Sequence, residues 1–163
     1  MFIIVALSNY LVLFPINDWL TWGAFSYPAS FLITELTNRF FGSQIARRVV
    51  YLGFVVGVIL SIFLATPRIA FASGFAFLVS QLLDISIFNR LRKYPWWYSP
   101  FFASLIASAL DTLLFWQIAF FGEQMPLINY MMGDFSIKLA IDILMLTPFR
   151  LVIRKSALSE AIG

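Results

Sequence analysis

Cysteine and histidine are both absent from this chain. Without them the protein has no disulfide bond, no thiolate nucleophile and no zinc site with nitrogen or sulfur ligands. Haem ligation through histidine and acid–base catalysis by imidazole are excluded as well. Charged residues are scarce, at 12% of the chain against about 25% in an ordinary globular domain. We therefore expect no cofactor and no metal site, and we do not expect an enzyme.

Apolar residues, by contrast, are abundant, at 61% of the chain with a mean hydropathy of +0.90. An ordinary globular domain is about 45–50% apolar. A soluble protein of 163 residues could not hide this much apolar surface in one core. The bilayer is therefore the expected solvent, and the predicted fold class is an all-α integral membrane protein.

Apolar runs separated by polar residues, proline or glycine predict a compact bundle of about six transmembrane helices, in one domain over residues 1–163. The predicted spans are residues 1–16, 24–42, 48–66, 68–89, 98–121 and 134–153. Most of them reach the length of about 20 residues that crosses the hydrocarbon core. Met1 leads straight into apolar residues, so a cleavable signal peptide is not expected.

The basic residues are unevenly divided between the two sides of the predicted bundle. Nine of the eleven fall on one side: Arg39, Arg47, Arg48, Arg90, Arg92, Lys93, Arg150, Arg154 and Lys155. Arg68 falls on the other side, as do Asp18, Glu123 and Asp134, while Lys138 lies within a span. The side rich in Lys and Arg faces the cytoplasm by the positive-inside rule. Both termini are therefore predicted to be cytoplasmic.

Five ionisable residues lie inside the apolar runs: Glu35, Asp84, Asp111, Lys138 and Asp142. A charge at bilayer depth costs about 2.5–3.5 kcal/mol on insertion scales, so such residues usually mark a path for a substrate or an ion. A purely structural membrane protein has little reason to contain five of them. The sequence therefore predicts a small transporter.

Two of these acids have polar neighbours on the same helix. Glu35, Asn38 and Arg39 share one helical face, with the acid before the base, the better order for an ion pair. These residues form either a self-neutralised pair near the cytoplasmic end or part of a site. Gln81 shares a face with Asp84 in the same way.

The other three ionisable residues lie in the last two predicted spans. Asp111 has no cation on its own helix and continues a face that contains Ser104 and Ser108, so we expect it to have a site or coupling role. Lys138 and Asp142 are one turn apart but in the less favourable order. Lys138 is therefore expected either to face the substrate or to pair across the bundle with Asp111 or Glu35.

The N-terminal third contains further polar and aromatic candidates. Asn9 offers an amide, for hydrogen bonding to a substrate or for helix packing. Trp22 and Phe25 precede Pro28 at the outer mouth of the second span, either as interfacial anchors or as a broken helix of the kind that lines binding sites. Aromatic rings beside carboxylates and amides suit a flat, nitrogen-rich ring.

Two patterns concern packing. Gly53, Gly57 and Ser61 recur every four residues and predict a flat ridge for another helix, which leaves room for a homodimer. Residues 31–38 resemble residues 77–84 at every position except the seventh. Parallel repeats of this kind are one way to build a transporter, with the site between the repeated parts.

Several segments together resemble the bacterial queuosine precursor transporter family, within the vitamin uptake transporters. They are Thr21 to Gly42, Pro67 to Ala70, Gln81 to Asp84, Phe88 to Leu91, and Asp111-Thr112. The likeness covers nearly the whole chain in order, although the N-terminus is shorter than is usual in the family and the connection at Thr66-Pro67 is brief.

The resemblance implies import of 7-cyano-7-deazaguanine or 7-aminomethyl-7-deazaguanine across the bacterial inner membrane, for queuosine modification of tRNA, without direct binding of nucleic acid. The substrate-binding candidates are Asn9, Trp22, Phe25, Glu35, Asn38, Gln81, Asp84, Asp111 and Lys138, and the candidates for coupling or ion pairing are Arg39 and Asp142. A carboxylate such as Glu35 or Asp111 would accept from the donor edge of the ring, and Lys138 or an amide would meet its carbonyl.

Two other functions are considered. Six short helices suit equally a substrate-capture subunit that an ATPase partner drives, as in energy-coupling vitamin importers. An intramembrane aspartyl enzyme would use Asp84 and Asp111, and the mark of such an enzyme would be two carboxylates that share one proton.

Overall fold

The computed structural model describes residues 7, 11, 14–17, 20–22 and 28–162. Within these residues the chain forms five helices and one pair of short antiparallel strands. The elements are β1 (Pro15–Asn17), β2 (Leu20–Thr21), α3 (Pro28–Phe41), α4 (Ser43–Leu64), α5 (Pro67–Leu91), α6 (Tyr98–Phe120) and α7 (Leu127–Ile162). The helical bundle agrees with the predicted all-α class, and the two strands are an addition to it.

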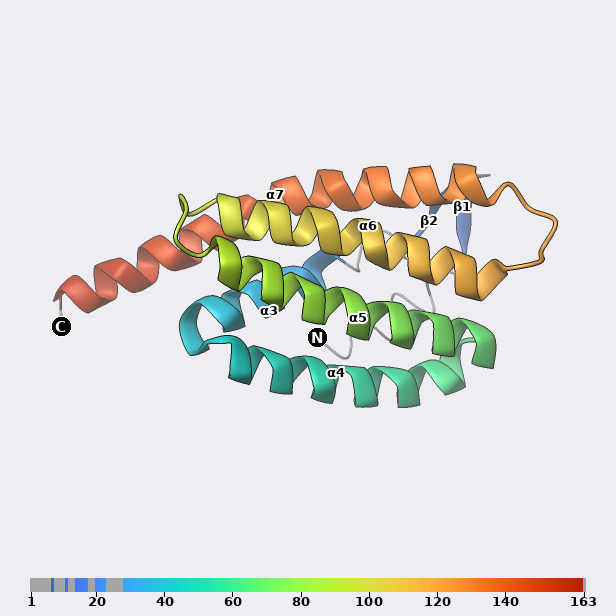
Figure 1. The fold of residues 1–163 in the computed structure, drawn as a ribbon, viewed down its shortest axis with the longest axis horizontal. Coiled ribbons are helices and arrows are strands. Elements are labelled where there is room, and N and C mark those ends of the chain that lie inside the picture. Colours follow the sequence, from blue (N-terminus) through green and yellow to red (C-terminus); the bar gives the residue numbers. More distant parts are fainter. Residues whose placement is uncertain (1–6, 8–10, 12–13, 18–19, 23–27, 163) are drawn as a thin grey trace.

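Helices α4, α5, α6 and α7 lie side by side in a row, and α3 lies behind them (Figure 1). Helix α5 packs against α4 and α6, and α3 contacts all four of the other helices. Short connections make consecutive helices antiparallel. Gly42 alone joins α3 to α4, with a φ of 83° that favours glycine. Thr66 caps α5, because its hydroxyl oxygen accepts from the Ile69 amide at 3.3 Å.

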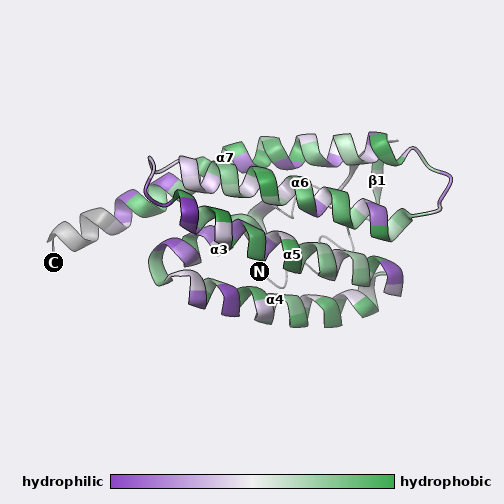
Figure 2. Ribbon diagram, viewed as in Figure 1, coloured by the Kyte–Doolittle hydropathy of each residue, from purple (hydrophilic) through white to green (hydrophobic). Residues whose placement is uncertain are grey.

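Three helical segments in the described part of the chain are long and apolar enough to cross a membrane: Ser43–Phe63, Pro67–Leu91 and Tyr98–Phe120. Figure 2 shows hydrophobic residues along most of their length. Helix α7 is longer still, with 36 residues, but its first half contains Asp134, Lys138 and Asp142. The described helix α3 has 14 residues, about 21 Å, which is shorter than a hydrocarbon core of about 30 Å.

Several helix ends differ from the ends of the predicted spans. Helix α4 begins at Ser43 rather than at residue 48, so Arg47 lies inside the helix and not in the connection before it. Helix α7 begins at Leu127, seven residues before the predicted start at 134. Pro15 and Ile16, which were expected to end the first span, belong to β1. The rest of the first predicted span lies largely outside the described residues.

The packing ridge of α4 faces the interior of the bundle. Gly53, Gly57 and Ser61 are all buried within the single chain. The small residues therefore serve the close approach of neighbouring helices. They give no support to the expected homodimer, because residues of the same chain already cover this ridge and a second copy could not pack on it.

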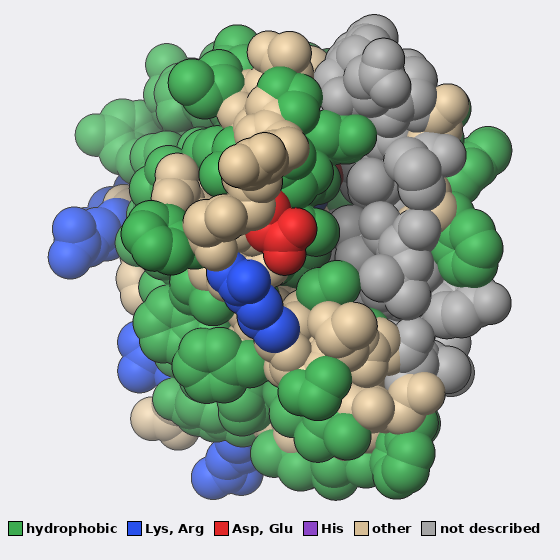
Figure 3. All heavy atoms as spheres, turned by 90° about the vertical axis from the view of Figure 1, so that its right-hand side faces the viewer, with side chains coloured by type: hydrophobic (Ala, Val, Ile, Leu, Met, Phe, Trp, Pro, Cys, Tyr) green, Lys and Arg blue, Asp and Glu red, His purple; other side chains and the backbone are tan. Residues whose placement is uncertain are grey.

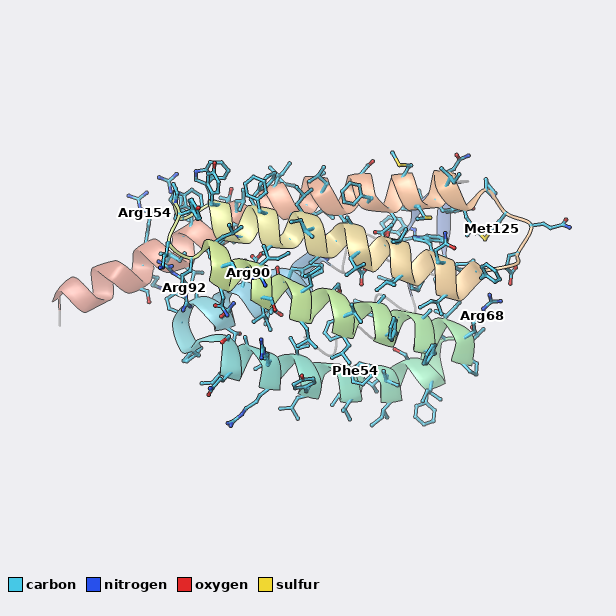
Figure 4. All side chains as sticks on the ribbon, viewed as in Figure 1. Phe54, Arg68, Arg90, Arg92, Met125 and Arg154 are labelled. Carbon is cyan, nitrogen blue, oxygen red and sulfur yellow. The ribbon has the colours of Figure 1, made fainter. Side chains whose placement is uncertain are left out.

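Exposed charged side chains lie at the two ends of the bundle. Arg90, Arg92 and Arg154 lie at one end, which we call the basic end, and Arg68 lies at the other (Figure 4). Arg68 pairs there with Glu123 at 3.8 Å. Seen from the Arg68 end, one red and one blue group adjoin on a face that is otherwise mostly hydrophobic or neutral (Figure 3). The predicted orientation, with the basic residues on the cytoplasmic side, requires such a separation of Arg90, Arg92 and Arg154 from Arg68.

An arginine at each end also satisfies the C-terminal carbonyls of a helix. Arg92, just after α5, donates from Nη2 to the backbone oxygen of Asn38 near the end of α3. Arg68, at the start of α5, donates to the oxygens of Ile118 and Phe121 at the end of α6, at 3.1 and 2.5 Å. The last carbonyls of a helix have no partner within it, so these contacts tie each helix end to its neighbour.

Helix α4 packs closely against α5 at Gly74, and we expect that this position tolerates no side chain. A Cβ atom there would lie 2.6 Å from Val58 Cγ2 and 3.2 Å from Phe54 Cε2. Exchanging glycine for alanine normally stabilises a helix by about 0.5–1 kcal/mol. Overpacking typically costs about 1–3 kcal/mol, so Gly74→Ala should lower the melting temperature in detergent. The double variant Gly74→Ala, Val58→Ala should recover part of the loss, and a stabilising Gly74→Ala would contradict this account.

Candidate functional site

Polar side chains from four helices meet in the middle of the bundle, in what we call the polar layer. Its members are Ser30, Thr34, Glu35 and Asn38 on α3, Ser80, Gln81 and Asp84 on α5, Ser104, Ser108, Asp111 and Thr112 on α6, and Asp134, Lys138 and Asp142 on α7. None of them is more than 6% exposed. The layer is therefore closed to its surroundings.

The sequence places these groups inward by helical periodicity. On α7, Asp134, Lys138 and Asp142 follow one another at intervals of four residues. On α6, Ser104 and Ser108 are also four residues apart, and Asp111 follows after three. Residues at these spacings share one face of a helix. Each helix thus presents a polar stripe to the bundle interior and apolar residues elsewhere.

Lys138 is the centre of one half of the polar layer. Its Nζ atom lies 2.6 Å from Asp134 Oδ2 and 2.9 Å from Asp111 Oδ2, and it donates to Thr112 Oγ1 at 3.1 Å. Asp134 Oδ2 also accepts from the Thr112 hydroxyl at 2.8 Å and from the Trp116 indole at 3.3 Å. Lys138 therefore ties α7 to α6 through Asp111 and Thr112, whereas its pair with Asp134 lies within α7.

Hydrogen bonds extend the layer to α5 and α3. Ser80 on α5 donates to Asp111 Oδ1 at 3.2 Å. The Gln81 amide accepts from Thr34 Oγ1 at 2.5 Å and donates to Ser30 Oγ at 2.9 Å. Thr34 and Gln81 belong to the two similar segments, 31–38 and 77–84, so these segments contact each other directly.

The remaining acids, Glu35, Asp84 and Asp142, form a group that we call the acidic cluster. Glu35 Oε1 accepts from Ser104 Oγ at 2.6 Å, and Asp142 Oδ2 accepts from Ser108 Oγ at 2.7 Å. Asp84 is fully buried, and neither of its carboxylate oxygens has a hydrogen-bond partner among the described residues. The cluster is therefore less well satisfied than the half around Lys138.

Apolar layers close the polar layer on both sides. Toward the Arg68 end lie Ile69, Ala72, Ala76, Phe115, Trp116 and Ala119, and toward the basic end lie Phe88, Ala103 and Phe149. Aromatic contacts reinforce both layers. Trp116 stacks on Tyr130 with ring centroids 5.1 Å apart, and Phe88 meets Phe149 edge to face at 6.1 Å. The polar groups are thus sealed between two hydrophobic plugs.

Some predicted site residues lie away from this layer. Trp22 is 52% exposed, and Arg39 is exposed at the basic end of α3. The self-neutralised pair of Glu35 with Arg39 is absent from the described residues, because Glu35 turns inward to Ser104. Asn9 and Phe25 lie outside the described residues.

Most of the other predicted members are brought together. Asn38, Gln81, Asp84, Asp111 and Lys138 all belong to the layer. Lys138 pairs with Asp111, one of the two partners expected across the bundle, and the alternative pair with Asp142 is replaced by the bond from Ser108.

The prediction of the position of Asp134 from the sequence was wrong. It was expected on the outer side, whereas it is buried beside Lys138. Its position four residues before Lys138 is the favourable order for a helical ion pair, so a signal was present. Thr112 and Trp116, which also contact Asp134, were not expected in the site.

The layer offers carboxylate and amide oxygens as acceptors, and amide, hydroxyl and ammonium groups as donors. The Asp111 carboxylate is bonded to Lys138 and Ser80, whereas an aspartyl dyad would share a proton between Asp111 and Asp84. No group of three or more acids in the described part of the chain is arranged to hold a metal ion. This chemistry suits reversible binding of a polar molecule.

Comparisons with known proteins relate this chain to transporters. Residues 21–65 and 58–153 match the model of a family described as putative vitamin uptake transporter. A queuosine precursor transporter of Escherichia coli (strain K12) is 35% identical over an alignment of 142 positions, which covers 72% of this chain and 64% of that protein. A probable queuosine precursor transporter of Haemophilus influenzae is 32% identical over 186 positions, covering 89% of this chain and 79% of that protein.

A probable queuosine precursor transporter of Bacillus subtilis (strain 168) is 28% identical over 130 positions, which covers 63% of this chain and 57% of that protein. This chain thus spans less than two thirds of the Escherichia coli and Bacillus subtilis proteins. No solved structure matches it at a significant level.

Proposed function

This chain belongs to the putative vitamin uptake transporter family, and from that premise we propose that it imports queuosine precursors across the bacterial inner membrane. The proposed substrates are 7-cyano-7-deazaguanine and 7-aminomethyl-7-deazaguanine. The names of the relatives support this substrate class. Three helices long enough to span a bilayer support a multi-pass membrane protein.

The observation that carries the proposal is the closed polar layer at the centre of an apolar bundle. A purine-like ring has a donor edge at its ring N–H and amino groups and an acceptor at its carbonyl. Glu35 or Asp111 would accept from the donor edge, and Lys138 would donate to the carbonyl. The amides of Asn38 and Gln81 supply both functions. Paired and hydrogen-bonded groups of this kind at bilayer depth are typical of a substrate path.

Transport requires the two hydrophobic plugs to open one at a time. The plug around Trp116 and Tyr130 would open toward the Arg68 end, and the plug around Phe88 and Phe149 toward the basic end. Rocking of helices around a fixed central site is the usual form of alternating access. In our proposal the basic end faces the cytoplasm, and the substrate enters from the Arg68 end.

Cells that lack their own precursor synthesis provide the direct test. With this gene expressed and precursor supplied at limiting concentration, queuosine should reappear in tRNA, as measured by mass spectrometry of nucleosides. Cells without the gene should show little or none. Equal queuosine in both strains would refute the proposal. Uptake by the purified chain alone in liposomes would exclude dependence on an ATPase partner, and recovery of unchanged precursor would exclude an enzyme.

Glu35→Gln should lower uptake of the precursors by at least about tenfold. The change keeps the shape of the side chain but removes the charge that Ser104 and the proposed substrate both contact. A hydrogen bond to a charged group contributes about 1.5–3 kcal/mol, which corresponds to at least about tenfold. Initial rates of labelled precursor uptake measure the effect. Wild-type rates in a correctly inserted Glu35→Gln variant would remove Glu35 from the site.

A further inference from the structure

The polar layer contains more negative than positive groups. Its acids are Glu35, Asp84, Asp111, Asp134 and Asp142, and Lys138 is the single buried basic residue in the described part of the chain. If every group is ionised, five carboxylates and one ammonium give a formal charge of −4. Uncompensated charge is strongly disfavoured in a bilayer interior. The layer is therefore suited to a ligand that brings positive charge.

The unbalanced charge is concentrated in the acidic cluster. Lys138 is engaged by Asp111 and Asp134, which leaves Glu35, Asp84 and Asp142 without a cation in hydrogen-bond contact among the described residues. The charges of these three acids are close enough to interact with one another. When all three are ionised, their mutual repulsion makes the cluster the most negative part of the layer.

Helix geometry independently places the three acids at one level. Ser104 and Ser108, which bind Glu35 and Asp142, are one turn apart on α6, a spacing of about 5–6 Å between Cβ atoms. Asp84 is one turn beyond Ser80, toward the basic end of α5. Ser80 donates a hydrogen bond to Asp111 on α6, which runs antiparallel to α5. Ser108 lies one turn before Asp111 on α6, so it too is displaced toward the basic end. The acids of α3, α5 and α7 therefore surround the same turn of α6.

This region also lacks hydrogen-bond donors. Both oxygens of Asp84 and the carbonyl oxygen of the Asn38 amide are buried without a partner among the described residues. The Asn38 amide nitrogen donates to the backbone oxygen of Ile85, the residue after Asp84 on α5, at 3.4 Å. About 90% or more of buried polar groups have a partner, so three orphaned acceptors in one place call for a donor. A positive group with several N–H bonds would satisfy them.

We propose that Glu35, Asp84 and Asp142 form a subsite for a primary ammonium group on the transported molecule. An ammonium supplies one positive charge and three donors, and the two Asp84 oxygens and the Asn38 amide oxygen are three acceptors without a partner among the described residues. The inference rests on the proposed function, and it assigns a preference for the aminomethyl precursor over the uncharged nitrile.

The test compares the two precursors in proteoliposomes that contain the purified full chain. The wild type should take up the aminomethyl compound with a kcat/KM at least about tenfold above that of the nitrile, since a buried charge pair typically discriminates by this factor or more. In Asp84→Asn this ratio should fall by at least about tenfold, toward one. Glu123→Gln removes an exposed carboxylate far from the cluster and should leave the ratio unchanged. Asp142→Asn provides the same readout should Asp84→Asn fail to insert.

The outcomes separate this inference from the proposed function. If the wild type moves neither compound, the proposed function fails and the subsite fails with it. If it moves both, and the ratio is the same in wild type and in the cluster variants, the subsite alone is overturned. The subsite is also overturned if nitrile uptake by the wild type requires a sodium or proton gradient and nitrile uptake by the cluster variants does not. The cluster would then bind a free cation instead of the substrate.

Discussion

Replacing Lys138 with methionine is expected to reduce uptake of the proposed substrates by at least about a hundredfold and to destabilise the bundle. Methionine is unbranched and uncharged, so Asp111 and Asp134 would lose the cation that they share at 2.9 and 2.6 Å. Removing one partner of a buried ion pair costs about 3–5 kcal/mol, because the remaining charge is left uncompensated. Uptake into proteoliposomes and thermal unfolding in detergent measure the two effects.

The triple variant Lys138→Met, Asp111→Asn, Asp134→Asn separates stability from transport. With both acids neutralised, the two carboxylates that Lys138 paired no longer carry uncompensated charge, so the melting temperature should return most of the way to the wild-type value. Uptake should stay low, because Lys138 and Asp111, two of the charged groups proposed to meet the substrate, are gone. A Lys138→Met variant with wild-type stability and wild-type uptake would show that Lys138 is not the centre of the site.

The sequence predicted the class of fold and much of the candidate site, because both follow from the cost of placing charge in lipid. Long apolar runs have few alternatives to membrane helices. A carboxylate such as Asp111 that has no cation on its own helix must find one on another. Sequence reasoning named Asp111 and Glu35 as the two candidate partners of Lys138 across the bundle, and the structure places Lys138 Nζ 2.9 Å from Asp111 Oδ2.

The sequence could not predict how the helices are rotated and at what height they meet. Those choices decide that Asp142 binds Ser108 rather than Lys138, and that Glu35 turns to Ser104 rather than to Arg39. Each alternative is compatible with the spacing along one helix. Only packing between helices distinguishes them, and that packing depends on side-chain shape over the whole bundle.

Helix ends were poorly predicted for a related reason. Basic residues were taken as markers of connections, and this placed the start of the third span at residue 48. Helix α4 begins at Ser43 and includes Arg47 and Arg48, both exposed. Long basic side chains extend from helix ends toward the interface, so a helix continues beyond its last apolar residue. Charge therefore indicates which side of the membrane a segment faces better than it indicates where a helix ends.

Asp134 and Glu123 provide the sharpest contrast between sequence and structure. Both are acids near the connection between the last two helices, and both were predicted on the outer side. The Glu123 side chain is 56% exposed and lies 3.8 Å from Arg68. The Asp134 side chain is 8% exposed and lies 2.6 Å from Lys138. Their replacement by alanine should therefore have very different effects.

Asp134→Ala should lower the free energy of unfolding by more than about 2 kcal/mol and uptake by at least about tenfold. The change removes the nearest partner of Lys138 and leaves the Thr112 hydroxyl and the Trp116 indole without their acceptor. Glu123→Ala should cost no more than about 1 kcal/mol, because exposed ion pairs contribute little, and uptake should stay within about twofold. Thermal unfolding and initial uptake rates of the two variants, measured side by side, provide the comparison. Equal losses would mean that Asp134 belongs to the outer surface after all, and that Asp111 alone holds Lys138 in the bundle.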